Sequence, residues 1–352
     1  TDIGPVIDLE AQQNIRQHIQ SMQDKGYKVH QLSHAQNSSD LNVGTFIPPT
    51  LIELPNLNDL KREIFGPVLH VITYKYGELK ALLEHINHKG YGLTMGLHTR
   101  IDETIQTTIA CAEVGNLYIN RNIVGAVVGV QPFGGEGLSG TGPKAGGPIY
   151  LYKLMQASQF PTHPFGTLKQ LSTAPISEVY TQFQAWVKSQ SDIDLHHYSS
   201  PTGLYELPGP TGESNQYSIV ARPRILVFAQ QKQEVLQQLA AIFAVGSQAV
   251  ILNSQIAAVQ VVQQLPKNIQ QAIHIIDDVL TGKFDAVLHH GHRGSLTQLQ
   301  QQIAKRQGAI VSITHLQDSQ AHMPLERLVI ERAISINTAA AGGNASLMTL
   351  ES

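Results

Sequence analysis

Short apolar segments alternate with helical segments through residues 224–313, and this alternation limits the possible folds more than any other feature. Strand-like runs are expected at residues 224–229, 249–252, 272–276, 284–288 and 309–313. Amphipathic helices are expected between them, at residues 235–243, 256–264 and 296–306. Short connections between alternating strands and helices favour a mostly parallel sheet with helices on its faces. We therefore predict a Rossmann-like α/β domain over residues 217–352.

The first 155 residues carry a second α/β pattern. Four apolar residues share one helical face: Ala11, Ile15, Ile19 and Met22. Gly26 stands where such a helix would end. Residues 68–74 form a short β-rich run, which is typical of a strand covered on both faces. A helix is predicted at residues 78–87, and the end of a strand at residues 117–120.

Residues 156–216 differ in character from both of these regions. One helical face is clear and consists of Ile176, Val179, Tyr180, Phe183, Trp186 and Val187. Residues 207–215 (LPGPTGESN) carry Pro and Gly signals that are typical of loops. We interpret this stretch as a connecting segment packed across the first domain. The predicted division of the α/β chain is therefore 1–155, 156–216 and 217–352.

Composition excludes several classes of protein. With 352 residues, 42% hydrophobic and 14% charged, the chain is long enough for two globular domains. A net charge of -3 does not indicate the excess of positive charge that binding to nucleic acid or an anionic membrane requires. The single cysteine, Cys111, excludes an internal disulfide and suits a reducing cytoplasm. The start at Thr1, without a leader, leads us to expect a piece of a longer protein.

Residues 124–147 (VGAVVGVQPFGGEGLSGTGPKAGG) contain nine glycines and a formal match, GEGLSG, to the dinucleotide fingerprint. That fingerprint needs a preceding strand and a following helix. Pro132 and Pro143 flank the match instead, and no helical periodicity follows. A flexible linker fits poorly, because valines and Phe133 are interleaved with the glycines. We predict a loop that lines a pocket, with GEGLSG as a turn that holds it.

Three further groups of residues are candidate sites. Glu63 and Phe65 precede Pro67 at a rigid turn. An acid held there could bind ribose hydroxyls, and an aromatic ring could pack on a flat ring. The alternative is an ordinary turn that begins a strand. His289, His290 and His292 lack an evident further metal ligand. We therefore predict a polar loop there and no metal site. Cys111 lies on a predicted helix among apolar neighbours, which favours a small buried residue over a nucleophile.

Two distant segments of the sequence resemble each other. Residues 115–120 (GNLYIN) and residues 333–337 (AISIN) are both apolar strands that end in Ile-Asn and open into glycine-rich sequence. The pattern alone leaves coincidence open.

Several motifs together resemble the aldehyde dehydrogenase superfamily. They occur in a consistent order and are TDIGPVID at 1–8, FIPPT at 46–50, EIFGPVL at 63–69, YGLTMGLHTR at 91–100, GNLYINR at 115–121 and QPFGGEGLSGTG at 131–142. GAVVGVQPFGG at 125–135 is similar to the 1-pyrroline-5-carboxylate (glutamate semialdehyde) dehydrogenases. LPGPTGESNQY at 207–217 and SINTAAAGGNASLM at 335–348 resemble the C-terminal part of the proline utilisation A (PutA) family.

The resemblance implies the C-terminal part of an aldehyde dehydrogenase catalytic domain, followed by a Rossmann-like domain with a terminal lid motif. It implies that Glu63 binds the nicotinamide ribose of NAD and that Phe65 packs near the nicotinamide. It further implies that the main-chain amides of Gly125 and Ala126 anchor the substrate carboxylate, and that Phe133 flanks the aliphatic part of glutamate semialdehyde. In the family, a cysteine thiolate attacks the aldehyde, hydride passes to NAD, and a thioester is hydrolysed to glutamate.

The family's nucleophilic cysteine, general-base glutamate and main NAD-binding domain would lie upstream of Thr1, so we expect the isolated chain to be inactive. The resemblance also implies an upstream FAD-dependent proline dehydrogenase domain, a homo-oligomer and a cytoplasmic location, with peripheral attachment to the inner membrane left open. Nucleic acid would be bound only through a further N-terminal domain that some members carry. An alternative is a non-catalytic lid and assembly module. For the second α/β region, AQQKQE after residues 224–229 lacks the glycines of a phosphate loop.

Overall fold

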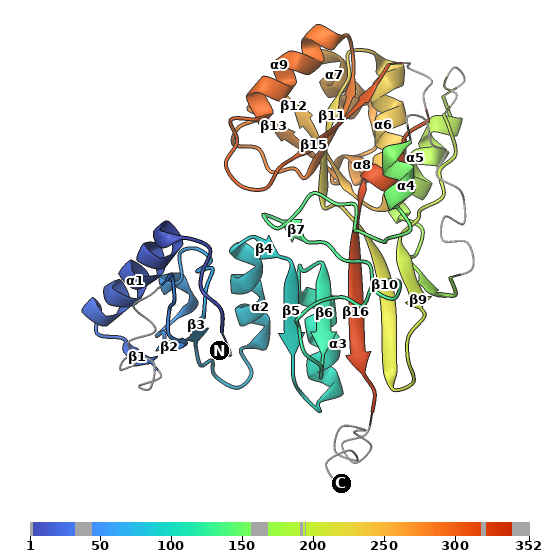
Figure 1. Ribbon diagram of the computed structural model, residues 1–352. Coiled ribbons are helices and arrows are strands. Elements are labelled where there is room, and N and C mark those ends of the chain that lie inside the picture. Colours follow the sequence, from blue (N-terminus) through green and yellow to red (C-terminus); the bar gives the residue numbers. More distant parts are fainter. Residues whose placement is uncertain are drawn as a thin grey trace. The chain divides into compact units, whose positions relative to one another are not determined.

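The computed structural model describes residues 3–31, 44–155, 168–190, 193, 195–317 and 322–339, and it divides the chain into two compact units, 1–88 and 89–352 (Figure 1). Both units mix helices with strands, so the predicted α/β class is confirmed. Most of the terminal lid motif, residues 340–352, lies outside the described residues. In the described ranges, no helix combines the length and the apolar character needed to cross a membrane.

The first unit packs one long helix against a small sheet. Its elements are α1 (Leu9–Asp24), β1 (Lys28–Gln31), β2 (Thr50–Glu53), η3 (Leu57–Asp59), β3 (Val68–Val71) and α2 (Leu79–His88). The predicted helical face of α1 buries Ile15, Ile19 and Met22 against a cluster that includes Ile52. β1 pairs with β2 in antiparallel fashion, and β2 pairs with β3 in parallel.

The prediction that residues 68–74 form a strand covered on both faces is wrong in its second part. β3 is an edge strand, and its Leu69 side chain is 60% exposed. The burial of β3 alternates along the strand because α1 covers only one face of this sheet.

The second unit contains a six-stranded sheet built from distant parts of the chain. In spatial order its strands are β5 (Thr94–Leu97), β6 (Asn116–Ile119), β16 (Val329–Asn337), β10 (Glu213–Ala221), β9 (Gly203–Leu207) and β8 (Gln170–Thr173). β16 pairs with β6 in parallel, from Ala333 opposite Asn116 to Ile336 opposite Ile119. The two similar segments of the sequence are therefore neighbouring parallel strands, and the Asn337 side chain donates a hydrogen bond of 3.2 Å to the Asn120 carbonyl.

A five-stranded parallel sheet forms the second half of this unit, in the order β13-β12-β11-β14-β15. Its strands are β11 (Arg224–Phe228), β12 (Gln248–Leu252), β13 (Ile273–Ile276), β14 (Ala286–His290) and β15 (Ser312–Leu316). The helices between them are α6 (Lys232–Val245), α7 (Ile256–Gln264), α8 (Lys267–Gln270) and α9 (Arg293–Ile303). This strand order is that of a Rossmann-like domain, as predicted.

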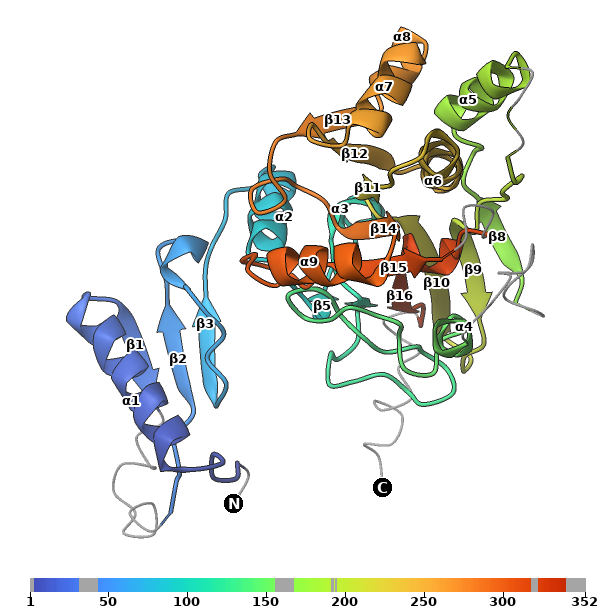
Figure 2. The same ribbon diagram turned by 90° about the horizontal axis from the view of Figure 1, so that it is seen from above.

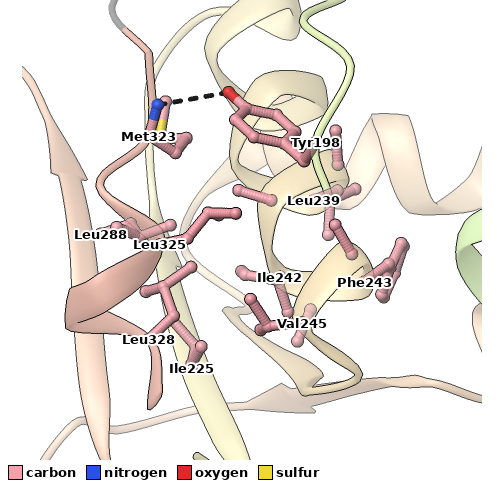
Figure 3. Packing of buried hydrophobic residues seen from close by; sticks show 14 of the residues in the cluster. Tyr198, Ile225, Leu239, Ile242, Phe243, Val245, Leu288, Met323, Leu325 and Leu328 are labelled. Atoms are coloured by element: carbon pink, nitrogen blue, oxygen red, sulfur yellow. Dashed lines mark hydrogen bonds between the residues drawn. The ribbon is translucent and has the colours of Figure 1, made fainter. Parts of the chain in front are cut away.

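Helices cover both faces of the parallel sheet (Figure 2). On one face, Ile225 and Leu288 pack with residues of α6 and α7, among them Leu239 and Phe243 (Figure 3). On the other face, Leu226 and Val287 pack with Leu299 and Ile303 of α9. The central strands are consequently buried on both sides, which explains their continuous apolar sequences.

The segment between the two sheets contains the predicted helix, α5 (Glu178–Lys188). Phe183 of α5 lies edge-on to Phe243 of α6, with 5.4 Å between ring centroids. The sequence interpretation did not include β8, β9 and the first residues of β10, which join the six-stranded sheet. Residues 156–167 of this segment lie outside the described ranges.

Candidate functional site

The GEGLSG sequence at 135–140 forms a tight turn and not a phosphate loop. Within it, β7 (Glu136–Gly137) pairs in antiparallel fashion with β4 (Tyr91–Gly92). A Cβ on Gly135 would lie 2.6 Å from the Ser139 carbonyl oxygen, so the turn closes tightly on bare backbone. The next helix, α4 (Tyr150–Leu154), begins well beyond the turn. This geometry agrees with the expected role of a turn that holds the neighbouring loop.

The loop that precedes this turn is closed by Gln131. The backbone N–H groups of Val130 and Gln131 both donate to the Val127 carbonyl, at 3.0 Å. In return, the Val127 N–H donates to Oε1 of Gln131 at 2.9 Å. Gly129 has a φ of +82°, which a side chain would strain. Residues 127–131 therefore form a defined turn, at the end of the segment that carries Gly125 and Ala126.

The predicted carboxylate anchors, Gly125 and Ala126, lie in the exposed half of this loop. Both residues are half-exposed, and their flanking residue Val124 is 92% exposed. Neither amide donates to another group within the ranges that the structure describes. A Cβ on Gly125 would meet no atom of the chain within 4 Å. Two adjacent uncommitted amides are a suitable receiver for an anion.

Phe133, the third predicted substrate residue, is held by its backbone. Its N–H and carbonyl exchange hydrogen bonds of 3.0 and 2.8 Å with Ala145, and its side chain is half-buried. The structure thus brings Gly125, Ala126 and Phe133 into one loop of the second unit.

Lys144 fixes the same loop from inside. Its side chain is buried, and Nζ donates to Asn116 Oδ1 at 2.9 Å and to the Gly134 carbonyl. Burial lowers the pKa of Lys144 to about 8, and the neighbouring Glu331 and Glu136 carboxylates offset part of this effect. These contacts give Lys144 a structural role.

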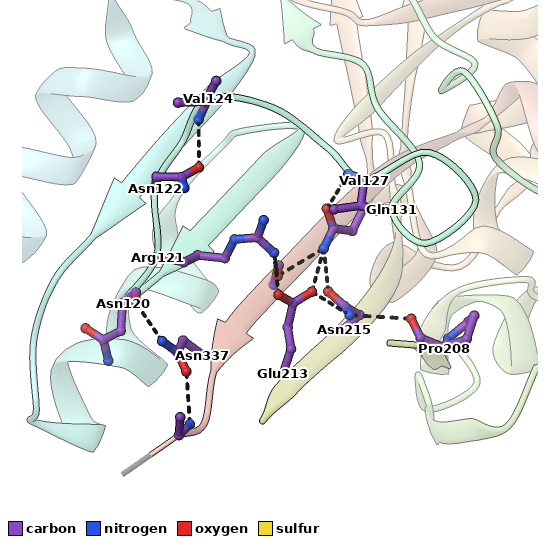
Figure 4. A network of polar contacts seen from close by, with 12 residues as sticks. Asn120, Arg121, Asn122, Val124, Val127, Gln131, Pro208, Glu213, Asn215 and Asn337 are labelled. Carbon is purple, nitrogen blue, oxygen red and sulfur yellow. Dashed lines mark hydrogen bonds and ion pairs between the residues drawn. The ribbon is translucent and has the colours of Figure 1, made fainter. Parts of the chain in front are cut away.

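A largely buried polar network joins the loop to β10 and β16 (Figure 4). Nε2 of Gln131 donates to Glu213 Oε1 at 2.8 Å, to Asn215 Oδ1 at 2.8 Å and to Ser335 Oγ at 3.2 Å. Arg121 forms an ion pair of 2.7 Å with Glu213 and a hydrogen bond of 2.7 Å to Ser335. Sequence reasoning missed these residues. The only local signal for them was their presence in the GNLYINR, QPFGGEGLSGTG, LPGPTGESNQY and SINTAAAGG motifs.

The predicted cofactor residues, Glu63 and Phe65, belong to the first unit. They lie in the irregular segment before β3, where the Pro67 carbonyl accepts a hydrogen bond of 2.9 Å from the Thr50 N–H. Both side chains are exposed, and the Phe65 ring is 87% exposed. An exposed carboxylate and an exposed ring two positions apart can receive a hydroxyl group and a flat heterocycle.

In the Rossmann-like half, the position of a phosphate loop is filled by a side chain of the protein. The Glu234 carboxylate accepts hydrogen bonds of 3.1 Å from the N–H groups of both Gln230 and Gln231, at the N-terminus of α6. A pyrophosphate at this helix end would need the same donors. Gln238 fills the space beyond, with hydrogen bonds to Phe228 and to His290.

The prediction that His289 and His290 lie in a polar loop is wrong. Both are buried in β14, and only His292 lies beyond it, where it caps α9. His289 Nδ1 lies 3.0 Å from His315 Nδ1, and its Nε2 lies 3.1 Å from Ser295 Oγ. Burial and the nearby His315 lower the pKa of His289 to about 4. Among the residues described, no group of three or more His, Cys, Asp or Glu could hold a metal ion.

Cys111 is the last residue of α3 (Asp102–Cys111) and is half-buried. Its location on a helix agrees with the sequence prediction.

The loop, its motifs and the α/β fold can now be compared with those of known proteins. Residues 1–160 match the model of the aldehyde dehydrogenase family. More particularly, the chain is 46% identical, over 99% of its length, to the bifunctional protein PutA of Escherichia coli (strain K12). Over 159 residues it is 40% identical to a 1-pyrroline-5-carboxylate dehydrogenase of Geobacillus sp. (strain WCH70), a match that covers 45% of this chain and 30% of the relative.

The chain spans only 28% of the length of the Escherichia coli PutA protein. A solved structure of PutA from Corynebacterium freiburgense superposes on 89% of this chain and 29% of its own, with a TM-score of 0.54 and 21% identity. That similarity shows a shared fold.

Proposed function

We propose that this chain is the C-terminal part of a longer, PutA-type bifunctional enzyme, and that it contributes to the NAD-dependent oxidation of L-glutamate γ-semialdehyde to glutamate. Two similarities support this function. The chain matches PutA along 99% of its own length, and its first half also matches a 1-pyrroline-5-carboxylate dehydrogenase. The proposed contribution of these residues is to position substrate and cofactor.

The uncommitted amides of Gly125 and Ala126 are the observation that carries the proposal. In our proposal both amides donate to the carboxylate of the semialdehyde, and Phe133 packs against its aliphatic carbons. Hydrogen bonds from fixed amides to a charged acceptor are stronger than those between neutral groups. They would hold the far end of the substrate while its aldehyde reacts elsewhere.

The proposed NAD contacts are Glu63 and Phe65. The exposed Glu63 carboxylate would accept hydrogen bonds from ribose hydroxyls, and the 87% exposed Phe65 ring would pack against the nicotinamide. NAD supplies the hydride acceptor when it is bound. The residues of this chain would orient the cofactor, whereas the nucleophile and general base belong to the proposed upstream part.

For residues beyond 217 we propose a scaffold role, which is compatible with the catalytic role of the first 155 residues. Two observations support it. Glu234 occupies the helix N-terminus that a dinucleotide would need. In addition, β16 supplies a strand between β6 and β10, so the last described strand completes a sheet that begins in the aldehyde dehydrogenase part. A lid and assembly module in a different aldehyde dehydrogenase is the alternative.

The remaining parts of the proposal concern the whole polypeptide. They are an upstream FAD-dependent proline dehydrogenase domain, assembly into a homo-oligomer, and a cytoplasmic location. Peripheral attachment of the whole protein to the inner membrane is the alternative to a purely cytoplasmic location. Any nucleic-acid binding would belong to a separate N-terminal domain.

Replacement of Gly125 by valine in the longer polypeptide tests the anchor. A Cβ there meets no atom of the chain within 4 Å, so the fold should persist. The KM for the semialdehyde should rise about tenfold or more, because weakening a charged hydrogen bond costs about 1.5–3 kcal/mol. The KM for NAD should stay unchanged. Steady-state kinetics with each substrate varied would measure both.

Two results would contradict the proposal. A changed KM for NAD with an unchanged KM for the semialdehyde would show that the anchor assignment is wrong. Turnover of semialdehyde and NAD by the isolated chain would show that it does not depend on an upstream nucleophile. Val128→Ala is the matched control, because this side chain is 98% exposed in the same loop.

A further inference from the structure

Burial of apolar side chains does little to hold the loop that carries Gly125 and Ala126. Val124, Val127 and Val128 are 92%, 50% and 98% exposed. Exposed side chains contribute little packing energy, so the conformation of the loop must depend on its hydrogen bonds. Those of Val127 converge on Gln131, through the backbone N–H and the side-chain oxygen of that residue.

Gln131 is itself fixed at its other end by strands β10 and β16. Its side chain is buried, and Nε2 faces the acceptor oxygens of Glu213, Asn215 and Ser335. The two strands form a continuous antiparallel ladder from Glu213 opposite Asn337 to Ala221 opposite Val329. These three acceptors therefore lie on a rigid part of the molecule.

Charge balance makes this contact selective for an amide at position 131. Glu213 Oε2 is paired with Arg121 at 2.7 Å, while Glu213 Oε1 accepts hydrogen bonds from Gln131 and from Asn215. A glutamine side chain offers two N–H donors toward the strands and one oxygen toward Val127. A carboxylate at the same place would face Glu213 without a donor.

We propose that Gln131 is a positioning residue for the carboxylate anchor, and that it transmits the fixed geometry of β10 and β16 to the amides of Gly125 and Ala126. The bond from Val127 N–H to Gln131 Oε1 fixes the peptide plane between Ala126 and Val127. Only two rotatable backbone bonds then separate this plane from the Ala126 N–H. A preoriented donor binds an anion without a further ordering cost. The inference rests on the proposed function, because it assumes that these amides bind the substrate carboxylate.

The test uses the longer polypeptide and two aldehydes, glutamate semialdehyde and pentanal, which lacks both the carboxylate and the α-amino group. Gln131→Met keeps the length of the side chain and removes every hydrogen bond that it makes. The KM for the semialdehyde should rise about tenfold, the size expected for one weakened charged hydrogen bond. The kcat, the KM for NAD and the kinetics with pentanal should stay the same. A general structural defect would affect both aldehydes.

Ser335→Ala covers the case in which Gln131→Met does not fold. It removes one acceptor, 3.2 Å from Gln131, and should raise the semialdehyde KM by about threefold. Tyr217→Phe is the matched control. It removes the 2.5 Å hydrogen bond from Tyr217 to Glu331, which links the same two strands. Glu331 reaches the glycine-rich segment at the Lys144 N–H and not at Gln131 or Val127. This variant should lose stability and keep its preference between the two aldehydes.

Three outcomes overturn the inference or its basis. Equal losses with the semialdehyde and with pentanal would reduce Gln131 to a structural residue. If the unsubstituted enzyme prefers the semialdehyde and Gln131→Met keeps that preference, the proposed role of Gln131 is refuted and the carboxylate anchor is not. An unsubstituted enzyme that does not prefer the semialdehyde would refute the carboxylate anchor itself. Loss of selectivity in Gln131→Met and Ser335→Ala, but not in Tyr217→Phe, would support the proposal.

Discussion

Lys144 shows how a single buried charge can stabilise a glycine-rich loop. Its side chain is only 2% exposed. In place of water, its ammonium group donates hydrogen bonds to Asn116 Oδ1 and to the Gly134 carbonyl. Its backbone N–H donates at 3.0 Å to Glu331, on β16. The same residue therefore ties the loop to β6 and to β16. The cost is desolvation of the charge, which appears as the lowered pKa.

We expect the free energy of unfolding to rise between pH 8 and pH 10. The pKa of Lys144 is lowered from 10.5 to about 8 in the folded chain. Between these values the unfolded chain binds more protons than the folded chain, so raising the pH favours the folded state. The slope is at most about 1.4 kcal/mol per pH unit for one such group. Lys153, whose pKa is also lowered to about 8, adds a contribution of the same sign.

Urea denaturation at pH 8, 9 and 10 would measure this dependence. Lys144→Met should flatten the rise, because the substituted side chain cannot titrate. The raised pKa values of buried tyrosines, among them Tyr217 and Tyr198, oppose part of this rise as the pH approaches 10, because these hydroxyls ionise first in the unfolded chain. A free energy of unfolding that falls from pH 8 to pH 10 in the unsubstituted chain would contradict the prediction.

Local periodicity was sufficient to predict most of the regular elements. The helical face of α1 and the boundaries of α7 agree with the expected ones, because apolar spacing along a helix is a local property. In α5 the predicted face is confirmed from Val179 onward, whereas Ile176 lies before the helix and is exposed. The predicted ends of β14 and β15 were displaced by two or three residues. The displacement put His289 and His290 outside the strand. Histidines are poor strand signals, and their burial depends on partners such as Gln238 and His315.

Of the candidate site, the sequence indicated only the loop, and its role as a pocket-lining segment stays a prediction. Glycines and interleaved apolar residues indicated a pocket-lining segment at 124–147, and the structure gives that segment two uncommitted amides. The contacts that hold the segment were not predictable. Glu213 and Ser335 are 82 and 204 residues from Gln131 in the sequence. Only the pairing of β16 with β6 and β10 brings them together, and strand pairing over such separations leaves no periodic signal.

Glu234 offers a test of how α6 begins. Replacement by alanine removes a carboxylate that accepts two backbone N–H groups, those of Gln230 and Gln231. Loss of an N-terminal cap of this kind should lower the free energy of unfolding by about 1–2 kcal/mol. Glu178→Ala in the first turn of α5 is the control, because among the described residues that carboxylate accepts only from the exposed Gln182 side chain. Equal effects of the two substitutions in urea denaturation would argue against the capping role.

The whole chain contains separate cores in its two compact units. The core of the first unit is small and centres on α1 and β2, with Ile52 fully buried. The second unit contains the much larger core around the parallel sheet. The predicted division at residues 1–155, 156–216 and 217–352 is drawn from sequence and family resemblance, and it stays a prediction. Compactness divides the chain after His88 instead.

Because each unit has its own core, we expect a destabilising substitution in one core to increase local unfolding in that unit and not in the other. Ile52→Ala leaves a cavity in the first unit, and large-to-small changes of this kind cost about 2–5 kcal/mol. Hydrogen exchange followed by mass spectrometry should show faster exchange in peptides from residues 9–24 and 50–71. Peptides from residues 224–303 should keep their protection. Leu226→Ala, at a fully buried position in the second unit, should give the reverse pattern. Faster exchange across both units after either substitution would show that the chain unfolds as one cooperative body.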